Sequence, residues 1–542
     1  MLPRRKILSE VLAETVALYG DRDAFIDPES RETWKSLADK VDRTAAALFK
    51  SGVRKGDHVA VMLGNGVHWL QSFFACARLG AVTVPVNTRF KKEELAFCLK
   101  QADISTLIST ENFLGIDFAS LLTEVEPALS QSLPGSALPV LKQVLMFNTG
   151  SLPAGATDFD QLIANVNTAD INACYTQCGD AEPDDILLIQ YTSGTTSFPK
   201  GVMLSHDNML SDAKAVSIRM GIDENDRYFS IRPFFHVAGS TLSVLVSLTT
   251  GCCLLTLPRF DVAQALRLLE QEKCTLTSGN DTIFLMLMAH PQFDASKLHL
   301  RGGWAAAGPQ VMQKIHDQMH VPNLCNAYGL SEASPNVVMS SWDDPLPLRV
   351  DGWALPHEGV QLRIADQQTG KNAKPGEAGE IQVKGWSVMR GYYNMPDVTA
   401  NTFTDDGWLK TGDLGVMNED GRLKMVGRLK DMFRVGGENV APTEVEGFIL
   451  LNEAIELAQV VGVPDERLGE VPAAFVVLKQ GHQCTPDELI DWCKSRISNF
   501  KVPRYVRIVD NFDEIGMTGS SKVQKNKLRA YAITALGLSE VQ

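Results

Sequence analysis

The stretch of sequence that decides the fold reads YTSGTTSFPKG and covers residues 191–201. An apolar run, ILLIQ at Ile186–Gln190, precedes it and predicts a buried strand. A second short apolar run follows at Val202–Leu204, and Ser205 is a typical N-cap for the helix expected after it. The loop between these strands is rich in glycine and hydroxyl side chains and ends in Lys200. Such a loop can direct backbone N–H groups and hydroxyls toward an anion, with the lysine as a point charge.

Phosphate binding is not the only interpretation of this loop. Its spacing differs from that of a Walker A loop, and composition alone favours a flexible surface linker equally. The order of the residues separates the two interpretations. TSGTT-x-x-PKG after Tyr191 resembles the signature of the adenylate-forming superfamily, although Ser197 stands where that family usually has glycine. The superfamily includes acyl-CoA synthetases, luciferases and the adenylation domains of peptide synthetases. The resemblance implies that the phosphates of ATP are bound by Thr192, Ser193, Gly194, Thr195, Thr196 and Lys200.

Upstream of the loop, strand-like and helix-like segments alternate. Asp57–Met62 and Ala81–Val86 are typical of strands, and His68–Leu79 between them is typical of a helix. This alternation favours a mostly parallel, doubly wound sheet. We expect a second α/β region from about residue 185 to 340. Residues 148–158, rich in Gly, Ser, Pro and Ala, are expected to form a loop between the two lobes.

The sequence pattern changes in the C-terminal third of the chain. From about Leu362, short strands alternate with turns such as Lys374–Glu377, which predicts a small antiparallel barrel or sheet. After Arg428 a compact α+β pattern begins, large enough to form its own domain. The predicted fold class is therefore α/β. A large N-terminal domain, residues 1–428, would hold two doubly wound sheets and a small β-barrel, and residues 429–542 would form a small α+β domain.

Composition narrows the classes of function. The chain has 542 residues, too many for one core, and its 44% hydrophobic and 21% charged residues are ordinary for globular proteins. The formal net charge of −14 argues against a nucleic-acid partner. No stretch reaches the roughly 18 uncharged apolar residues of a spanning helix, so stable membrane insertion is not expected. The ten cysteines form no CxxC pair, which favours reduced thiols in a cytoplasmic protein over a disulfide frame or a zinc site.

Later segments resemble the same family in the same order, over about residues 20–530. Pro233–Gly239, PFFHVAG, resembles a segment in which His236 would lie beside the acyl pocket, although a lone histidine near a strand end is equally often part of the core. Ala305–Pro309, AAAGP, resembles a turn that lines the pocket and approaches the adenine at Gly308.

Tyr328–Glu332, YGLSE, carries the next resemblance. It implies that Tyr328 stacks on adenine, that Ser331 contacts a phosphate and that Glu332 holds Mg²⁺. One glutamate is enough for this, because Mg²⁺ usually takes one or two carboxylates together with phosphate oxygens. Without the resemblance, a glutamate after a turn is most often a solvated charge.

The remaining segments concern the nucleotide and the thiol. Trp408–Asp413 (WLKTGD), Gly427–Asp431 (GRLKD), Gly436–Pro442 (GGENVAP) and Thr518–Arg529 (TGSSKVQKNKLR) each resemble a segment of the family. The resemblance implies that Asp413 binds the ribose and that Arg428 contacts the nucleotide. It also implies that Lys430 is the pivot of a mobile C-terminal domain, that Gly436 and Gly437 enter the thiol tunnel, and that Lys522 is the adenylation lysine. Phe500 and Arg504 occupy the positions of coenzyme A contacts.

Together these segments imply an acyl-CoA synthetase that uses ATP, Mg²⁺ and coenzyme A. A carboxylate would attack the α-phosphorus of ATP, pyrophosphate would leave, and the thiol of coenzyme A would then take the acyl group and release AMP. Three alternatives stay open: transfer to the phosphopantetheine of a carrier protein, a luciferase-like adenylate oxidase, and a binding protein without activity. The expected partner is a small carboxylic acid, and a homodimer is one option for assembly. Largely apolar pocket walls favour a medium-sized aliphatic or aromatic acid.

Overall fold

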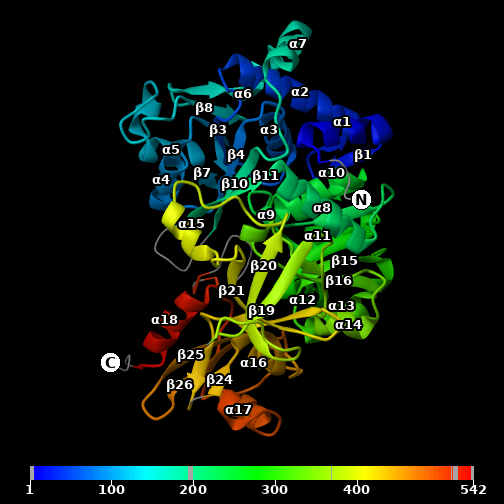
Figure 1. Ribbon diagram of the computed structural model, residues 1–542, viewed down its shortest axis with the longest axis vertical. Coiled ribbons are helices and arrows are strands. Elements are labelled where there is room, and N and C mark those ends of the chain that lie inside the picture. Colours follow the sequence, from blue (N-terminus) through cyan, green and yellow to red (C-terminus); the bar gives the residue numbers. More distant parts are fainter. Residues whose placement is uncertain are drawn as a thin grey trace. The chain divides into compact units, whose positions relative to one another are not determined.

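The computed structural model describes residues 5–192, 199–367, 369–436, 438–513, 515–516 and 523–538. Two compact units can be distinguished in it (Figure 1). Unit 1 comprises Met1–Ser278, Gly329–Val337 and Gly385–Thr402. Unit 2 comprises Gly279–Tyr328, Val338–Lys384 and Phe403–Gln542. Each unit is therefore assembled from segments that are far apart in the sequence.

A seven-stranded sheet in unit 1 has the order β11-β10-β4-β3-β5-β8-β9. Its strands are β3 (His58–Val61), β4 (Val82–Pro85), β5 (Thr106–Thr110), β8 (Gln143–Phe147), β9 (Ala156–Asp158), β10 (Ile186–Thr192) and β11 (Lys200–Ser205). All neighbours are parallel except β10 and β11, which form an antiparallel hairpin. β4 and β5 are buried along their whole length and β8 along all but its first residue, as is usual for parallel strands in a sheet that helices cover.

Two expectations about the lobes are wrong. β10 pairs in parallel with β4 through Leu188 and Thr83, so the strand before the phosphate loop belongs to the first sheet and does not begin a second region. The segment 148–158 does not separate two lobes, because β9 at its end pairs with β8 of the same sheet. A Gly- and Pro-rich composition identifies a loop but does not say which strands that loop joins.

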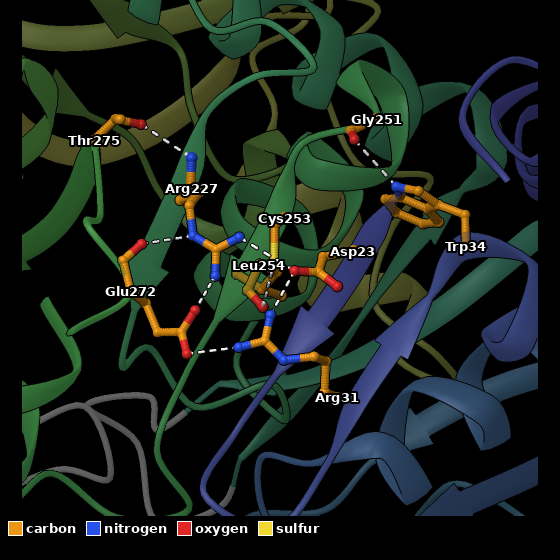
Figure 2. A network of polar contacts seen from close by, with 9 residues as sticks. All are labelled: Asp23, Arg31, Trp34, Arg227, Gly251, Cys253, Leu254, Glu272 and Thr275. Carbon is orange, nitrogen blue, oxygen red and sulfur yellow. Dashed lines mark hydrogen bonds and ion pairs between the residues drawn. The ribbon is translucent and has the colours of Figure 1, made fainter. Parts of the chain in front are cut away.

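The second sheet of unit 1 has the order β14-β12-β13-β1-β2. Its strands are β1 (Asp23–Ile26), β2 (Arg31–Thr33), β12 (Arg227–Ser230), β13 (Cys253–Leu255) and β14 (Leu276–Asn280). Figure 2 shows how ion pairs fasten the N-terminal strands to it: Arg31 and Arg227 each contact both Asp23 and Glu272. Two guanidinium groups and two carboxylates alternate, so each charge in this network has two opposite neighbours.

Unit 1 contains most of the helices. They are α1 (Leu8–Tyr19), α2 (Trp34–Lys50), α3 (Val67–Arg78), α4 (Lys92–Gln101), α5 (Phe118–Val125), α6 (Phe159–Ala164), α7 (Thr168–Gln177), α8 (His206–Met220), α9 (Val237–Gly239), α10 (Val246–Thr250), α11 (Val262–Gln271) and α15 (Pro396–Thr402). A two-stranded hairpin, β6 (Asn112–Phe113) with β7 (Ile116–Asp117), completes this unit. Within the described ranges, no helix has both the length and the apolar character needed to cross a bilayer.

Unit 2 holds two further sheets before its C-terminal part. The first has the order β18-β17-β16-β15, with β15 (Gly302–Ala306), β16 (Asn323–Tyr328), β17 (Val338–Met339) and β18 (Leu355–Pro356). The second has the order β19-β20-β21-β22, with β19 (Val360–Ala365), β20 (Ala378–Gly385), β21 (Leu409–Met417) and β22 (Leu423–Arg428), and β21 pairs antiparallel with both β20 and β22. It lies where turn-rich sequence predicted short antiparallel strands. The helices here are α12 (Asp281–Ala289), α13 (Pro309–Met319) and α14 (Leu346–Asp351).

The C-terminal part of unit 2 is an α+β layer with its own apolar core. Its sheet has the order β24-β23-β26-β25, and β27 pairs with β26. These strands are β23 (Phe433–Val435), β24 (Glu438–Val440), β25 (Ile455–Asp465), β26 (Gly469–Leu478) and β27 (Tyr505–Ile508), with helices α16 (Pro442–Ile449), α17 (Pro486–Lys494) and α18 (Lys525–Ala535). Buried side chains between Phe433 and Ala532 form one cluster. The predicted α/β fold class is confirmed.

Candidate active site

The ends of the predicted phosphate loop lie opposite each other on neighbouring strands. Thr192 pairs with Lys200 in the register of β10 and β11, and the Thr192 hydroxyl donates to the Lys200 carbonyl at 3.5 Å. Ser205 caps α8 as predicted, since its Oγ accepts the N–H of Asn208. β10 and β11 thus form an antiparallel hairpin whose second strand leads directly into helix α8. Four of its predicted phosphate ligands, Ser193, Gly194, Thr195 and Thr196, lie outside the described residues.

Lys200 and Glu332 both contact the side chain of Tyr392. The Lys200 ammonium lies 4.9 Å from the centroid of the Tyr392 ring, and the Tyr392 hydroxyl donates to Oε1 of Glu332 at 2.8 Å. Tyr392 is 5% exposed. Burial and the adjacent Glu332 carboxylate raise the pKa of Tyr392, so the phenol keeps its proton. The predicted phosphate lysine and the predicted metal ligand therefore belong to one cluster in unit 1.

Backbone hydrogen bonds hold this cluster together. The segment that carries Tyr392 lies along β11, where the Tyr393 N–H donates to the Gly201 carbonyl at 2.8 Å and the Arg390 N–H donates to the Met203 carbonyl at 3.0 Å. The Met389 N–H donates to the carbonyl of Glu332 itself at 2.9 Å. One short segment thus joins the strand that begins at Lys200 to the turn that holds Glu332.

Two polar side chains on α8 form hydrogen bonds with the segments that precede Tyr392 and follow Glu332. Asn208 donates to the carbonyls of Trp386 and Val388. One turn along the helix, Asp212 accepts the N–H of Asn336 at 2.9 Å, and burial raises the pKa of its carboxyl well above the usual range. Ser331 lies with Glu332 in the short 3₁₀ helix Ser331–Ala333, just before this contact. The helix that follows the phosphate loop therefore also positions the segment with the predicted metal ligand.

His236 begins the short helix α9, and its Nδ1 accepts the N–H of Ala238 at 3.1 Å. In the neutral ring the proton is then on Nε2. The histidine is therefore fixed by its backbone neighbour and is only partly buried. This arrangement fits the predicted place beside an acyl group better than full burial in the core would.

In unit 2, Tyr328 and Arg428 flank Asp413. The Tyr328 hydroxyl donates to Oδ2 of Asp413 at 2.9 Å, and Nε of Arg428 lies 3.4 Å from Oδ1. β21 and β22 bring the last two residues together, because Asp413 pairs with Arg428 in their register. Burial, and then the Asp413 carboxylate, raise the pKa of Tyr328 well above its usual range. Three predicted nucleotide residues thus form one cluster.

Gly308 is the N-cap of α13, two residues after the end of β15 and directly before Pro309. Its N–H donates to Oδ1 of Asp281 at 3.1 Å, and Asn326 donates to the carbonyl of the preceding Ala307 at 3.1 Å. The turn predicted to approach the adenine is therefore held from two sides by polar side chains.

Lys430 follows β22 in a turn, where the Leu429 N–H donates to the Gly412 carbonyl at 3.0 Å. Burial, and then the charge of Arg428, lower the pKa of Lys430. Gly436 occupies the turn between β23 and β24 with a φ of +60°, which favours glycine, and its N–H donates to Leu468. Gly437 and Lys522 lie outside the described residues.

The two predicted coenzyme A contacts lie in the C-terminal layer. Phe500 packs against the edge of the apolar cluster, with the Lys501 ammonium 5.5 Å from its ring centroid. The Nη1 atom of Arg504 lies 4.0 Å from Oδ2 of Asp465. These contacts join the two residues to other side chains of the C-terminal layer and do not test a role in coenzyme A binding. The coenzyme A role of both residues stays a prediction. Within the described ranges, no group of three or more His, Cys, Asp or Glu side chains could hold a metal ion by itself.

A residue of the Lys200 and Glu332 cluster that the sequence did not indicate is Tyr392. It lies in the run RGYYN at Arg390–Asn394, which has no charge pattern, repeat or spacing that marks a site. Its place in the cluster becomes visible only through its contacts with Glu332, 60 residues away, and with Lys200.

Comparison with known proteins extends over nearly the whole chain. A family model described as AMP-binding enzyme matches residues 12–393, and one described as AMP-binding enzyme C-terminal domain matches residues 444–522. A putative acyl-CoA synthetase of Bacillus subtilis is 37% identical, over 99% of this chain and 98% of the relative. The mitochondrial medium-chain acyl-CoA ligase of Mus musculus is 33% identical, over 96% of this chain and 87% of the relative.

Two solved structures are similar throughout. An anthranilate CoA ligase in complex with anthranoyl-AMP has a TM-score of 0.86 at 24% identity, with 99% of both chains covered. This likeness concerns the fold alone. The o-succinylbenzoate CoA synthetase of Bacillus subtilis, in complex with its acyl-adenylate intermediate, has a TM-score of 0.76 at 26% identity, with 96% of this chain and 97% of that chain covered.

Proposed function

Because this chain belongs to the AMP-binding enzyme family and is an ATP-dependent acyl-CoA ligase, we propose that the two clusters described above bind ATP while a carboxylic acid is activated. The reaction uses ATP, coenzyme A and an acid, and forms acyl-CoA and AMP. The main support for these residue roles is that Lys200 and Glu332 both contact the side chain of Tyr392. A phosphate ligand and a metal ligand must lie close together, because both act on the same bound anion.

Lys200 and Glu332 are the proposed ligands of the phosphate end of ATP. Lysine supplies a compact point charge for phosphate, and Glu332 supplies a hard carboxylate oxygen for Mg²⁺. The donor set fits this ion: Oε1 of Glu332 accepts from Tyr392, and in the described part of the chain no other hydrogen bond or ion pair engages the carboxylate. When bound, Mg²⁺ neutralises charge on the phosphates. Thr192 and Ser331 would donate their hydroxyls to the same anion.

Tyr328, Asp413 and Arg428 are the proposed ligands of the nucleoside. A carboxylate that is oriented by a phenol and a guanidinium can accept both hydroxyls of a ribose, and the Tyr328 ring offers a face for adenine. Gly308, with its N–H already held by Asp281, would let the base approach the backbone closely.

The chemistry needs charge neutralisation more than a covalent catalyst. A carboxylate oxygen forms a bond to the α-phosphorus, the bond to the β-phosphate oxygen breaks, and pyrophosphate leaves. Lys522 is proposed to bring positive charge to both reacting anions. In the second step the sulfur of coenzyme A attacks the acyl carbonyl, AMP leaves and the thiol proton is lost. His236, with its proton on Nε2, is a proposed donor beside the acyl group.

We further propose that residues 429–542 form a mobile domain that turns about Lys430 between the two steps. The separate apolar cluster between Phe433 and Ala532 supports this, since a domain that moves as one body needs its own core. A substitution that makes the turn at Lys430 rigid should therefore impair the thiol step, which needs the rotated domain, and leave adenylation intact.

Single substitutions test these roles. Lys522→Ala should abolish pyrophosphate release but largely spare transfer from supplied acyl-adenylate, whereas Lys430→Pro should stall the thiol step and spare adenylation. Lys527→Ala, which changes an exposed lysine of α18, serves as the matched control and should affect neither step. Equal loss of both steps in Lys522→Ala would rule out the separate-step assignment.

The acid proposed is of medium size and largely apolar. The Mus musculus relative is named as a medium-chain acyl-CoA ligase, and a relative from Rhodococcus jostii, 35% identical, is named for a bicyclic methyl-dioxo-octahydroindenyl propanoate. A panel of aliphatic and aromatic acids, scored by pyrophosphate release, tests this. Highest specificity for acetate or an amino acid would contradict it. A cytoplasmic location and a homodimer remain predictions.

A further inference from the structure

We infer that Tyr392 is a positioning residue that orients the Glu332 carboxylate toward the divalent cation and keeps Lys200 and Glu332 apart. The inference rests on the proposed function of these two residues, but it concerns a side chain that neither the sequence motifs nor the family resemblance indicated. It is based on three observations: one hydrogen bond, one contact between a cation and a ring, and the backbone anchors of the segment around Tyr392.

The hydrogen bond fixes one oxygen of Glu332. A carboxylate only accepts, so the Tyr392 hydroxyl is the donor, and its 2.8 Å distance to Oε1 is that of a well-formed bond. A glutamate has three rotatable side-chain bonds, and without a partner its carboxylate would sample several directions. With Oε1 held, Oε2 has a defined direction. This is the usual arrangement in metal sites, where a hydrogen bond from a neighbour orients each carboxylate ligand.

The ring separates two opposite charges. Lys200 lies 4.9 Å from the ring centroid while Glu332 contacts the hydroxyl, so the cation and the anion are at different parts of the same side chain. In the described structure they form no ion pair with each other. An attractive contact with the ring face holds the ammonium without neutralising it. Both charges therefore stay available for a phosphate and its cation, whereas a direct ion pair would have to be broken first.

The backbone leaves Tyr392 little freedom to move. Its own N–H donates to the hydroxyl of Thr399 at 2.9 Å, and Val202 of β11 forms a β-bridge with it. Gly391 before it has a φ of +130°, and a Cβ there would lie 3.0 Å from Thr399, so a glycine is required. The tyrosine is thus part of a rigid frame that begins at Lys200 and ends at Glu332.

Equilibrium binding of ATP at increasing Mg²⁺ concentration, without acid or coenzyme A, tests the inference. Tyr392→Phe keeps the ring and removes only the hydroxyl. It should raise the Mg²⁺ concentration for half-maximal ATP binding about 10-fold or more, the range for loss of a group that orients a metal ligand. Tyr392→Leu also removes the ring and should in addition weaken ATP binding at saturating Mg²⁺.

Tyr393→Phe is the matched control. It removes the hydroxyl of the next residue, which donates to Asp103 at 2.9 Å and lies against His58, away from Glu332. This variant should bind Mg²⁺ and ATP as the unmodified protein does. In a Glu332→Gln background, Tyr392→Phe should change the Mg²⁺ midpoint by less than about twofold, because coupled residues are not additive.

Three results would overturn the inference: an unchanged Mg²⁺ midpoint in Tyr392→Phe, an equal change in Tyr393→Phe, or a full additional change in the Glu332→Gln background. A lower melting temperature of Tyr392→Phe with a normal Mg²⁺ midpoint would also overturn it, by showing a purely structural role. Failure of the proposed function is distinguishable, because then the unmodified protein would form no AMP from any acid, whatever the Mg²⁺ midpoints of the variants.

Discussion

Tyr328 donates its phenolic hydrogen to Oδ2 of Asp413 at 2.9 Å, and this hydrogen bond orients the carboxylate. Arg428 approaches the other oxygen from the paired strand. A carboxylate held in this way can exchange one partner for a ribose hydroxyl without reorganising its surroundings. Preorganisation of this kind is one way in which binding energy is conserved.

Removal of the carboxylate should therefore weaken ATP binding through the ribose. We expect Asp413→Ala to raise the Kd for ATP about 10–100-fold, the value of one or two hydrogen bonds to a charged group. The unmodified protein should discriminate strongly between ATP and 2′,3′-dideoxy-ATP, and the variant should not. If Asp413→Ala kept the discrimination of the unmodified protein, another residue would bind the ribose.

Local sequence predicted the elements around the site well. The strands and helix near residues 57–86 were predicted within a residue of β3, α3 and β4, and Ser205 caps α8 as expected. These features depend on periodicity and on one capping side chain, both of which are local. Parallel pairing of β1 with β13 could not be predicted in this way, because it joins segments that are far apart along the chain.

Only those site residues that lie in recognisable sequence motifs were predicted. Tyr328, Asp413 and Arg428 were each named from separate segments, and the structure brings them together. Tyr392, Asn208 and Asp212 were missed, because each makes its contact with a distant backbone group or side chain. A buried aspartate on a helix, such as Asp212, has no sequence pattern that separates it from a solvated one.

The ion pair between Glu446 and Lys525 should stabilise the C-terminal layer. Lys525 contacts Glu446 and the carbonyl of Val460, and Glu446 accepts the N–H of the same Val460 at 2.7 Å. Both side chains are less than one fifth exposed. Loss of one partner leaves the other charge poorly solvated, so Lys525→Met should cost roughly 2–3 kcal/mol of unfolding free energy.

The control for this prediction is Lys494→Met. It breaks an exposed pair with Asp491 and should cost less than about 0.5 kcal/mol. Urea unfolding followed by near-UV circular dichroism measures both variants. Equal effects would mean that burial of the Glu446 pair contributes nothing.

Acid should destabilise unit 1 through His206. Burial lowers the pKa of the His206 imidazole from 6.5 to about 4, and its Nδ1 accepts the N–H of Leu8 at 3.1 Å. Between these two values the unfolded chain binds a proton that the folded chain does not, so stability is lost as the pH falls from about 6.5 to about 4. The maximal loss from this group is on the order of 3 kcal/mol.

His206→Asn tests this pH dependence, because asparagine keeps an acceptor near Nδ1 but does not titrate. The variant should lose less stability than the unmodified protein between pH 6.5 and pH 4, the bounds set by the two pKa values, as measured by denaturant unfolding. Parallel pH profiles of the two proteins would mean that other groups cause the acid sensitivity.

Most cysteines should resist alkylation in the folded protein. All ten are free, and only Cys178 and Cys484 are not fully buried. Burial raises the pKa of Cys76 to about 12 and that of Cys252 to about 11, so the reactive thiolate is scarce near neutral pH. Iodoacetamide followed by peptide mass spectrometry should label Cys178 and Cys484 first. Rapid labelling of Cys76 under native conditions would contradict its burial.

The central claim is that a carboxylate oxygen of the acid attacks the α-phosphorus of ATP, and an isotope measurement tests it most directly. The purified protein is supplied with ATP, Mg²⁺, coenzyme A and a medium-sized acid in which both carboxylate oxygens are oxygen-18. We expect each AMP formed to gain one labelled oxygen on its phosphate, in step with the formation of acyl-CoA. Unlabelled AMP, label in inorganic phosphate with ADP as product, or no AMP from any acid tried would contradict it.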